Sequence, residues 1–435
     1  MVFLKDTILK KLQSNPVAQQ MLQFGNNIGN LFPNEEALCM ASAFMQDKQT
    51  RIVVKKNRYE AQQLYQRLKP LVEDTLLFVM EESLRVQAIA SSPEDKQEQL
   101  YVLTQLVKED KPRIIICNTA AFLRYLPDKE LFKSLCFKFE VDQEITMAEL
   151  KQKLNRAGYT KVNYVDRPCT YASRGGIVDV YCLEYEHPIR IEFFDTVIES
   201  IRLFHEETQR TIQTIDSVLI NPATDLLFTD DQIEYLQKEI DSELEKQQAK
   251  LIQDDYEFLL DYIEKDKISI ENYDIDPHLY IYFSYLNANK LTDYVNGHII
   301  FSSQEEVENG YKKLNEETIS FIQEMVESHQ YLPKYSMFHD IFTFEKEHTI
   351  QMFHDFLDFK HPIFSKIETL EKSDQPLIQI LENLKGKNIY ISLDEEHTKK
   401  VQEALKAYSI HRNITFIEDD FYEGFTYEDL SVYTQ

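Results

Sequence analysis

The hydrophobic pattern of residues 35–125 alternates between helical periodicity and short apolar runs. The runs at 51–56, 75–80 and 113–118 are almost uniformly apolar, which is typical of strands buried on both faces. Helical patterns separate them. The expected helices span 35–46, 58–68 and 94–107. Strands that alternate with helices indicate a parallel sheet, so residues 1–125 are predicted to be the first part of an α/β domain.

Residues 126–212 have a different period. A helix is expected at 147–157, and it is followed by segments in which apolar and polar residues alternate. These segments lie at 162–165, 176–181, 189–194 and 200–204. Period-two alternation with short connections predicts a small antiparallel sheet with one helix.

The pattern becomes helical and acidic after residue 213. Thr229 and Gln232 have the spacing of a capping box, and an apolar stripe follows at intervals of three and four. The stripe consists of Ile233, Leu236, Ile240 and Leu244. A strand is expected at 298–303. Residues 331–361 show no clear period and are interpreted as a connector. Residues 213–345 are predicted to hold the second part of the α/β domain plus connector.

The tail, residues 346–435, predicts a small acidic α/β domain. A helix around 377–384 ends at Gly386, a strand follows at 388–392, then a helix at 395–408 and a strand at 414–418. The last residues, 431–435, continue a strand-like pattern. We therefore expect the natural chain to continue beyond Gln435.

Length and charge narrow the function classes. A chain of 435 residues predicts three or four domains. Residues 1–220 carry 28 Lys and Arg against 30 Asp and Glu, whereas residues 221–435 carry 19 against 44. Twelve of the 13 arginines lie in the first half, so a surface that binds a partner through guanidinium groups is expected there. The acidic second half repels polyanions.

Cysteine usage and hydropathy indicate a cytoplasmic protein. The five cysteines are scattered and none forms a C-x-x-C pair, so disulfides and zinc knuckles are not expected. No apolar run is long enough to cross a bilayer, and the first residues do not form a signal peptide.

The motifs of catalysis and nucleotide binding are missing from the sequence. Gly386-Lys387 is followed by Asn388, so no P-loop is present, and neither G-x-G-x-x-G nor G-x-S-x-G occurs. A metal site is conceivable in one segment, which contains His348, His354, Asp355, Asp358 and His361. Because no H-E-x-x-H or i,i+4 histidine pair occurs, this segment is interpreted as solvated or packed instead. We expect no catalytic residue, metal ligand or cofactor in this chain.

Two features of the second region are typical of a binding site. Only 9 glycines occur, yet Gly175 and Gly176 are adjacent, which indicates a tight turn or a close approach by another chain. In 189–194 the period of two places Arg190, Glu192 and Phe194 on the face opposite to the core. An outward aromatic beside arginine is typical of a binding hot spot, although Phe194 could also lie under another domain.

Residues 158–212 closely resemble the module shared by the excision-repair protein UvrB and the transcription-repair coupling factor (Mfd) family. The resemblance rests on four blocks in order. They are Arg174–Asp179, Arg190–Asp195, Glu199–Arg202 and Thr208–Arg210. In that family the module docks the damage-recognition protein UvrA, and the matching positions imply that Arg174, Arg190 and Phe194 contact UvrA, with Gly175 and Gly176 shaping the turn.

The resemblance also implies a fold. The flanking segments are expected to form one degenerate helicase-like parallel α/β domain, with the small antiparallel α+β module (126–212) inserted in it. Residues 30–47 contain no glycine where UvrB has its P-loop, and Ser302-Ser303 stands where an acidic pair is expected. The absence of these nucleotide-binding motifs matches the Mfd family rather than UvrB. Family members carry RNA-polymerase-binding and ATP- and Mg-dependent DNA-translocase domains beyond this region, and mask the UvrA surface until the motor engages DNA.

Three functions follow as hypotheses. The preferred one is a non-catalytic adaptor that recruits UvrA to RNA polymerase stalled at a DNA lesion. A UvrB-like ATPase that verifies damage is the second, and ATP binding would support it. An acidic DNA-mimic or DNA-binding module is the third, although residues 1–220 show no basic patch. No membrane association is expected.

Overall fold

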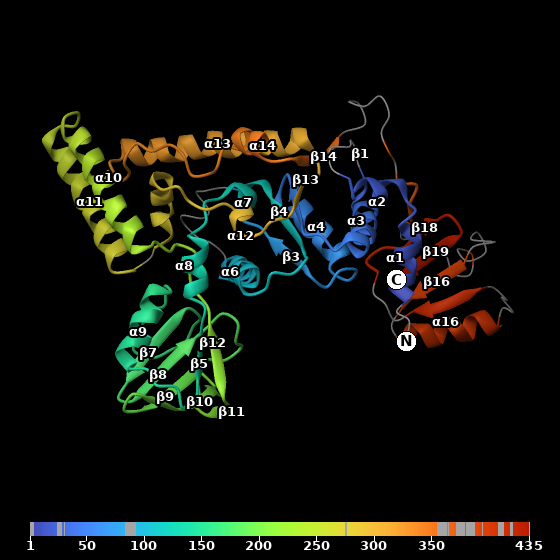
Figure 1. Ribbon diagram of the computed structural model, residues 1–435, viewed down its shortest axis with the longest axis horizontal. Helices are drawn as coiled ribbons and strands as arrows, with labels where there is room; N and C mark the ends of the chain where they lie inside the picture. The colour runs from blue at the N-terminus through green and yellow to red at the C-terminus, as the bar shows by residue number, and fades with distance from the viewer. Residues whose placement is uncertain are drawn as a thin grey trace.

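The computed structural model describes residues 4–23, 28–29, 31–82, 93–274, 276–354, 363, 365–370, 379, 388–393, 395–407, 413–417 and 421–434. A parallel sheet with its helices lies in the middle of the molecule, and an antiparallel module hangs below it (Figure 1). A pair of acidic helices projects on one side, and the tail unit packs on the other. The mixed α/β architecture predicted from the sequence is confirmed.

The parallel sheet has six strands in the order β1-β14-β13-β2-β4-β3, and every neighbouring pair is parallel. The strands are β1 (Ile28–Gly29), β2 (Arg51–Lys55), β3 (Thr75–Phe78), β4 (Ile114–Asn118), β13 (His298–Phe301) and β14 (Ile350–His354). Strands from before and after the module thus pair side by side, as an inserted module requires. Because β14 belongs to this sheet, the domain reaches residue 354, beyond the predicted boundary at 345.

Both faces of the parallel sheet are covered. In β2, Ile52 and Val54 belong to one hydrophobic core and Val53 belongs to the other, because alternate side chains point to opposite faces. The helices of this domain are α1 (Leu4–Leu12), α2 (Pro16–Gln20), α3 (Pro33–Asp47), α4 (Arg58–Leu68), α6 (Pro93–Lys108), α7 (Thr119–Leu123), α8 (Lys129–Ser134), α12 (Leu291–Tyr294), α13 (Gln304–Glu327) and α14 (Ile341–Glu347). The uniformly buried strands explain why the apolar runs predicted them so well.

The antiparallel module contains one helix, α9 (Met147–Arg156), and a six-stranded sheet in the order β11-β10-β9-β8-β7-β6. Its strands are β6 (Thr160–Lys161), β7 (Thr170–Arg174), β8 (Ile177–Tyr181), β9 (Ile189–Phe194), β10 (Val197–Phe204) and β11 (Thr211–Ile215). The strand expected at 162–165 is not formed. That segment is a loop. Its Val165 packs beside Phe204 on the outer face of the sheet, which is the face opposite to the core and carries Arg190 and Phe194.

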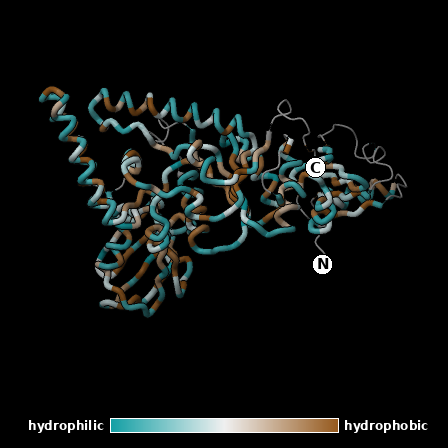
Figure 2. The backbone as a smooth tube through the Cα atoms, turned by 45° about the horizontal axis from the view of Figure 1, so that its top comes forward, coloured by the Kyte–Doolittle hydropathy of each residue, from teal (hydrophilic) through white to brown (hydrophobic). Residues whose placement is uncertain are grey.

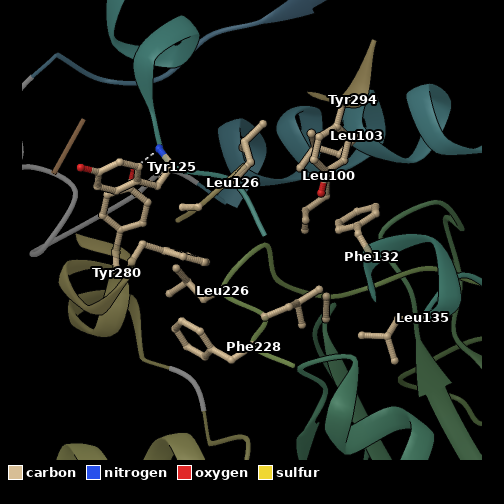
Figure 3. Packing of buried hydrophobic residues seen from close by; sticks show 14 of the residues in the cluster. Leu100, Leu103, Tyr125, Leu126, Phe132, Leu135, Leu226, Phe228, Tyr280 and Tyr294 are labelled. Atoms are coloured by element: carbon tan, nitrogen blue, oxygen red, sulfur yellow. Dashed lines mark hydrogen bonds between the residues drawn. The ribbon is translucent and has the colours of Figure 1, made fainter. Parts of the chain in front are cut away.

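A two-stranded neck joins the module to the rest of the chain. The neck pairs β5 (Phe137–Glu140) with β12 (Ser217–Ile220) in antiparallel register. One continuous core contains residues of the sheet domain, the module and the 3-10 helix η1 (Pro277–Tyr285). Figure 3 shows the part of this core that includes Leu100 of α6, Phe132 of α8 and Tyr280 of η1. There the Tyr125 backbone N–H donates to the Tyr280 hydroxyl at 2.7 Å. The module is therefore fixed at its base rather than tethered by a linker.

Two further units flank the sheet. The helices α10 (Asp230–Gln248) and α11 (Gln253–Glu271) form a hairpin, and α10 begins with the predicted capping box of Thr229 and Gln232. The tail sheet has the order β15-β18-β19-β16-β17 with helix α16 (Glu395–Ala407). Its strands are β15 (Glu368–Thr369), β16 (Asn388–Ser392), β17 (Ile414–Ile417), β18 (Phe425–Tyr427) and β19 (Leu430–Thr434). The helix expected at 377–384 lies outside the described residues apart from position 379.

Candidate protein-binding site

The glycine pair forms the hairpin turn between β7 and β8. Gly175 has a φ of +56°, a conformation that favours glycine. A Cβ on Gly176 would lie 3.0 Å from the backbone oxygen of Phe193, so the turn packs closely on the neighbouring strand. The turn leaves Arg174, the last residue of β7, exposed at this end of the sheet. The turn-shaping role predicted for the two glycines fits this geometry.

Phe194 lies at the same end of the sheet, immediately before the turn that joins β9 to β10. Its side chain is 74% exposed, whereas Ile189 and Ile191 of the same strand are fully buried. Phe193 is half-buried against the core. The period of two therefore assigned the faces of β9 correctly. An exposed benzyl ring next to the Arg174 turn gives this end of the module the composition of an interface anchor.

Arg190 points to the same face, but it is not exposed as predicted. Its Nε and Nη2 donate to the two carboxylate oxygens of Asp179 at 2.7 and 2.8 Å, and Nη2 also donates to Gln209 at 2.7 Å. The guanidinium carbon lies 4.3 Å from the centre of the Phe204 ring. These contacts leave Arg190 only 9% exposed, and its Nη1 makes no hydrogen bond within the described residues. The expectation of two equally presented guanidinium groups is therefore corrected.

Two further charges on this outer face, those of Glu192 and Arg202, are paired across strands. Glu192 of β9 accepts from the Ser200 hydroxyl at 2.8 Å and from the Arg202 guanidinium, both on β10. Arg190 and Asp179 face each other directly in the β8–β9 register. Cross-strand pairs of opposite charge stabilise the sheet and hold the backbone that presents Phe194.

Sequence reasoning missed one aromatic side chain near this face. Tyr164 is 66% exposed in the loop whose Val165 packs against Phe204. The loop was interpreted as a strand because its apolar and polar residues alternate. No signal in the sequence indicated that Val165 covers the outer face.

At the carboxyl ends of the parallel strands, where α/β sheets commonly bind ligands, the chain places its own ion pair. Glu36, near the start of α3, pairs with Lys55 at the end of β2, and both side chains are buried. The Ser302 hydroxyl donates to Glu36 at 2.9 Å, which brings together the two segments that lack nucleotide motifs. The chain's own side chains therefore occupy this end of the sheet.

Other expectations concern metals and membranes. His348 stacks on Phe344 with ring centres 4.1 Å apart, while the His354 side chain, Asp355, Asp358 and His361 lie outside the described residues. Within the described part of the chain, no group of three or more His, Cys, Asp or Glu could hold a metal ion. Among the described helices, none is both long and apolar enough to span a bilayer. All five cysteines are free thiols.

A family comparison decides what the module is. The family model of the UvrB interaction domain matches residues 137–226, from the first residue of β5 to six residues past β12. Residues 137–226 are therefore similar to the UvrB interaction domain. The match begins at β5, later than the predicted start at 126, and it extends past the predicted end at 212 to include β12, the partner of β5 in the neck.

Curated relatives match well beyond the UvrB interaction domain. The chain is 28% identical over 398 residues to the transcription-repair-coupling factor of Bacillus subtilis, covering 85% of this chain and 33% of that protein. It is 28% identical over 308 residues to the factor of Staphylococcus haemolyticus, covering 69% and 26%. The predicted resemblance is confirmed, and the chain spans about a third or less of the length of these relatives.

Proposed function

We propose that this chain is an adaptor that recruits UvrA to RNA polymerase stalled at a DNA lesion, as part of transcription-coupled nucleotide excision repair. The observation that carries the proposal is Phe194. It is a large apolar side chain that is 74% exposed, on the outer face of a UvrB interaction domain. Similarity to transcription-repair-coupling factors over 85% of the chain supports the same role.

In this proposal the outer face binds UvrA through three side chains. Phe194 is buried in an apolar pocket of UvrA, and Arg174 forms charge-assisted hydrogen bonds with UvrA carboxylates. Arg190 contributes only its Nη1 edge, because Asp179 and Gln209 already hold the other donors. Gly175 and Gly176 set the direction in which Arg174 leaves the sheet.

The chain itself acts without catalysis in this proposal. Glu36 and Lys55 fill the end of the parallel sheet, which supports a degenerate helicase-like domain that binds no nucleotide. Contacts with RNA polymerase and DNA, and ATP- and Mg-dependent translocation, belong to other regions of the full-length protein. Those regions also mask the outer face from UvrA until the protein engages DNA. The protein acts in the cytoplasm.

Calorimetric titration with purified UvrA tests the proposal. We expect a double variant, Arg174→Ala with Phe194→Ala, to lose about 2 kcal/mol or more of binding free energy, which is roughly a 30-fold rise in Kd. Tyr59→Ala is the matched control, because Tyr59 is 68% exposed on α4, far from the module in sequence. Unchanged affinity of the double variant refutes the assignment of this face.

A further inference from the structure

The acidic arm is defined as α10 and α11 (residues 230–271). The inner faces of its two helices are buried against each other. Leu236, Ile240 and Leu244 of α10 are buried, as are Leu259 and Ile263 of α11. These residues form the core of the hairpin, and the two helices lie side by side and project from the body (Figure 1). Any further partner must bind to the outer side.

The base of the acidic arm is anchored firmly. Arg156 of the UvrB interaction domain pairs with Asp230 at 2.7 Å. Asp266, which is 4% exposed, accepts hydrogen bonds from Tyr282 at 2.7 Å and lies 2.7 Å from a ring nitrogen of His278. The arm is therefore held in one direction, and its outer side is a preformed surface rather than a flexible tail.

Large apolar side chains are exposed on this outer side. Ile252, at the tip, is 68% exposed, and Phe258 and Ile268 of α11 are each 55% exposed. Figure 2 shows apolar positions at the free end of an otherwise mostly hydrophilic arm. Intervals of four, three, four and three place one stripe along α11, on the side away from the hairpin core. The stripe consists of Asp254, Phe258, Asp261, Lys265 and Ile268.

The charge around these apolar side chains is strongly negative. Residues 230–271 contain 14 Asp and Glu and 5 Lys, a net charge of −9. Lys246, Lys265 and Lys267 are paired with carboxylates of the arm itself. Asp254 and Glu257 at the tip form no ion pair within the described chain. Such a surface repels nucleic acid and attracts cations.

We propose that the outer side of the acidic arm docks a lysine- or arginine-rich amphipathic segment of a second protein. Apolar side chains of that segment pack on Ile252 and Phe258, while its cations pair with Asp254 and Glu257. Charge complementarity identifies a basic occupant, and the exposed isoleucine and phenylalanine require that it also be apolar. This surface lies on different elements from Phe194, so the proposal does not depend on UvrA binding.

Fluorescence anisotropy with this chain and a labelled amphipathic peptide of leucine and lysine tests the proposal. We expect saturable binding that weakens at least about tenfold in the double variant Ile252→Ser with Phe258→Ser. Ile319→Ser is the matched control, since Ile319 is 41% exposed on α13, and it should leave the affinity unchanged. A peptide of equal charge with serine in place of leucine should bind at least about tenfold more weakly.

Three results overturn the proposal. Equal affinity of the double variant and the parent shows that the peptide responds to net charge alone. Equal affinity of the serine peptide leads to the same conclusion. A concentration-dependent dimer that the double variant abolishes, measured by light scattering without peptide, assigns the surface to a second copy of this chain.

Discussion

Arg190 uses most of its hydrogen-bonding capacity inside its own domain. Its direction could be predicted, because the period of two in β9 depends only on neighbouring residues. The burial of its guanidinium group could not be predicted. Phe204 at the end of β10 and Gln209 in the turn after β10 contact this group, and the pairing of β10 with β11 shifts register between Leu203 and Phe204. The pattern also gave the direction of Phe194, but whether another domain covers it was left open, and the structure shows the side chain 74% exposed.

Exchanging the charges at positions 179 and 190 tests separately whether Arg190 stabilises its domain and whether it contacts UvrA. Asp179→Ala should destabilise the domain by about 3 to 5 kcal/mol, because it leaves a largely buried guanidinium without its partner. The exchange of Asp179→Arg with Arg190→Asp should recover most of that stability in urea unfolding. It should not recover UvrA affinity, because a carboxylate then replaces the Nη1 edge. Full recovery of binding would make Arg190 a positioning residue only.

At the scale of elements, local signals predicted some helices and missed others. The capping box and apolar stripe identified α10. The 24-residue α13 was missed because its buried side chains are sparse. Val307, Leu314 and Phe321 recur only every seven residues in an acidic background. Such a helix is stabilised by its contacts with the sheet domain, which no local pattern contains.

The anchor of α11 should make stability depend on pH. Burial alone would lower the pKa of His278, but hydrogen bonds to Asp266 and Asp276 outweigh this effect and raise it to about 8. Because this value lies above the ordinary 6.5, the protonated ring stabilises the folded state. The contribution is complete below about pH 6.5 and is lost as the pH rises through 8.

Urea unfolding at about pH 6 and at about pH 9 checks this dependence. We expect a loss on the order of 1 to 2 kcal/mol between them in the parent protein, and a smaller loss in His278→Gln. An equal loss in both proteins contradicts the assignment of the effect to His278.

At the scale of the whole molecule, the parallel sheet joins segments that lie more than two hundred residues apart. The strand β14 escaped prediction because Gln351 interrupts its apolar run. That side chain is 1% exposed and donates to the backbone oxygens of Gln20 and Gln23 at 3.1 and 3.3 Å. In the sequence a glutamine indicates a surface position. Its burial here is explained only by the backbone oxygens of the N-terminal segment, which accept its hydrogen bonds.

The tail unit should unfold together with the N-terminal helices. Lys11 pairs with Asp429 at 3.2 Å, Arg67 pairs with Glu423, and Phe425 lies fully buried in the core that also contains Leu12. Phe425→Ala should therefore lower the free energy of unfolding by about 3 to 5 kcal/mol. In calorimetry it should lower the midpoint temperature of one transition that the tail unit and the N-terminal helices share. Tyr235→Ala, at a position 47% exposed, is the control. Two separate transitions in the parent protein would show that the tail folds independently.

The neck of β5 and β12 places the entry and the exit of the UvrB interaction domain side by side, with Phe139 opposite Val218. A cassette whose two ends meet can be cut out or transplanted while the host strands keep their neighbours. The same placement allows such a module to be exchanged between host proteins without a change in the fold of the host.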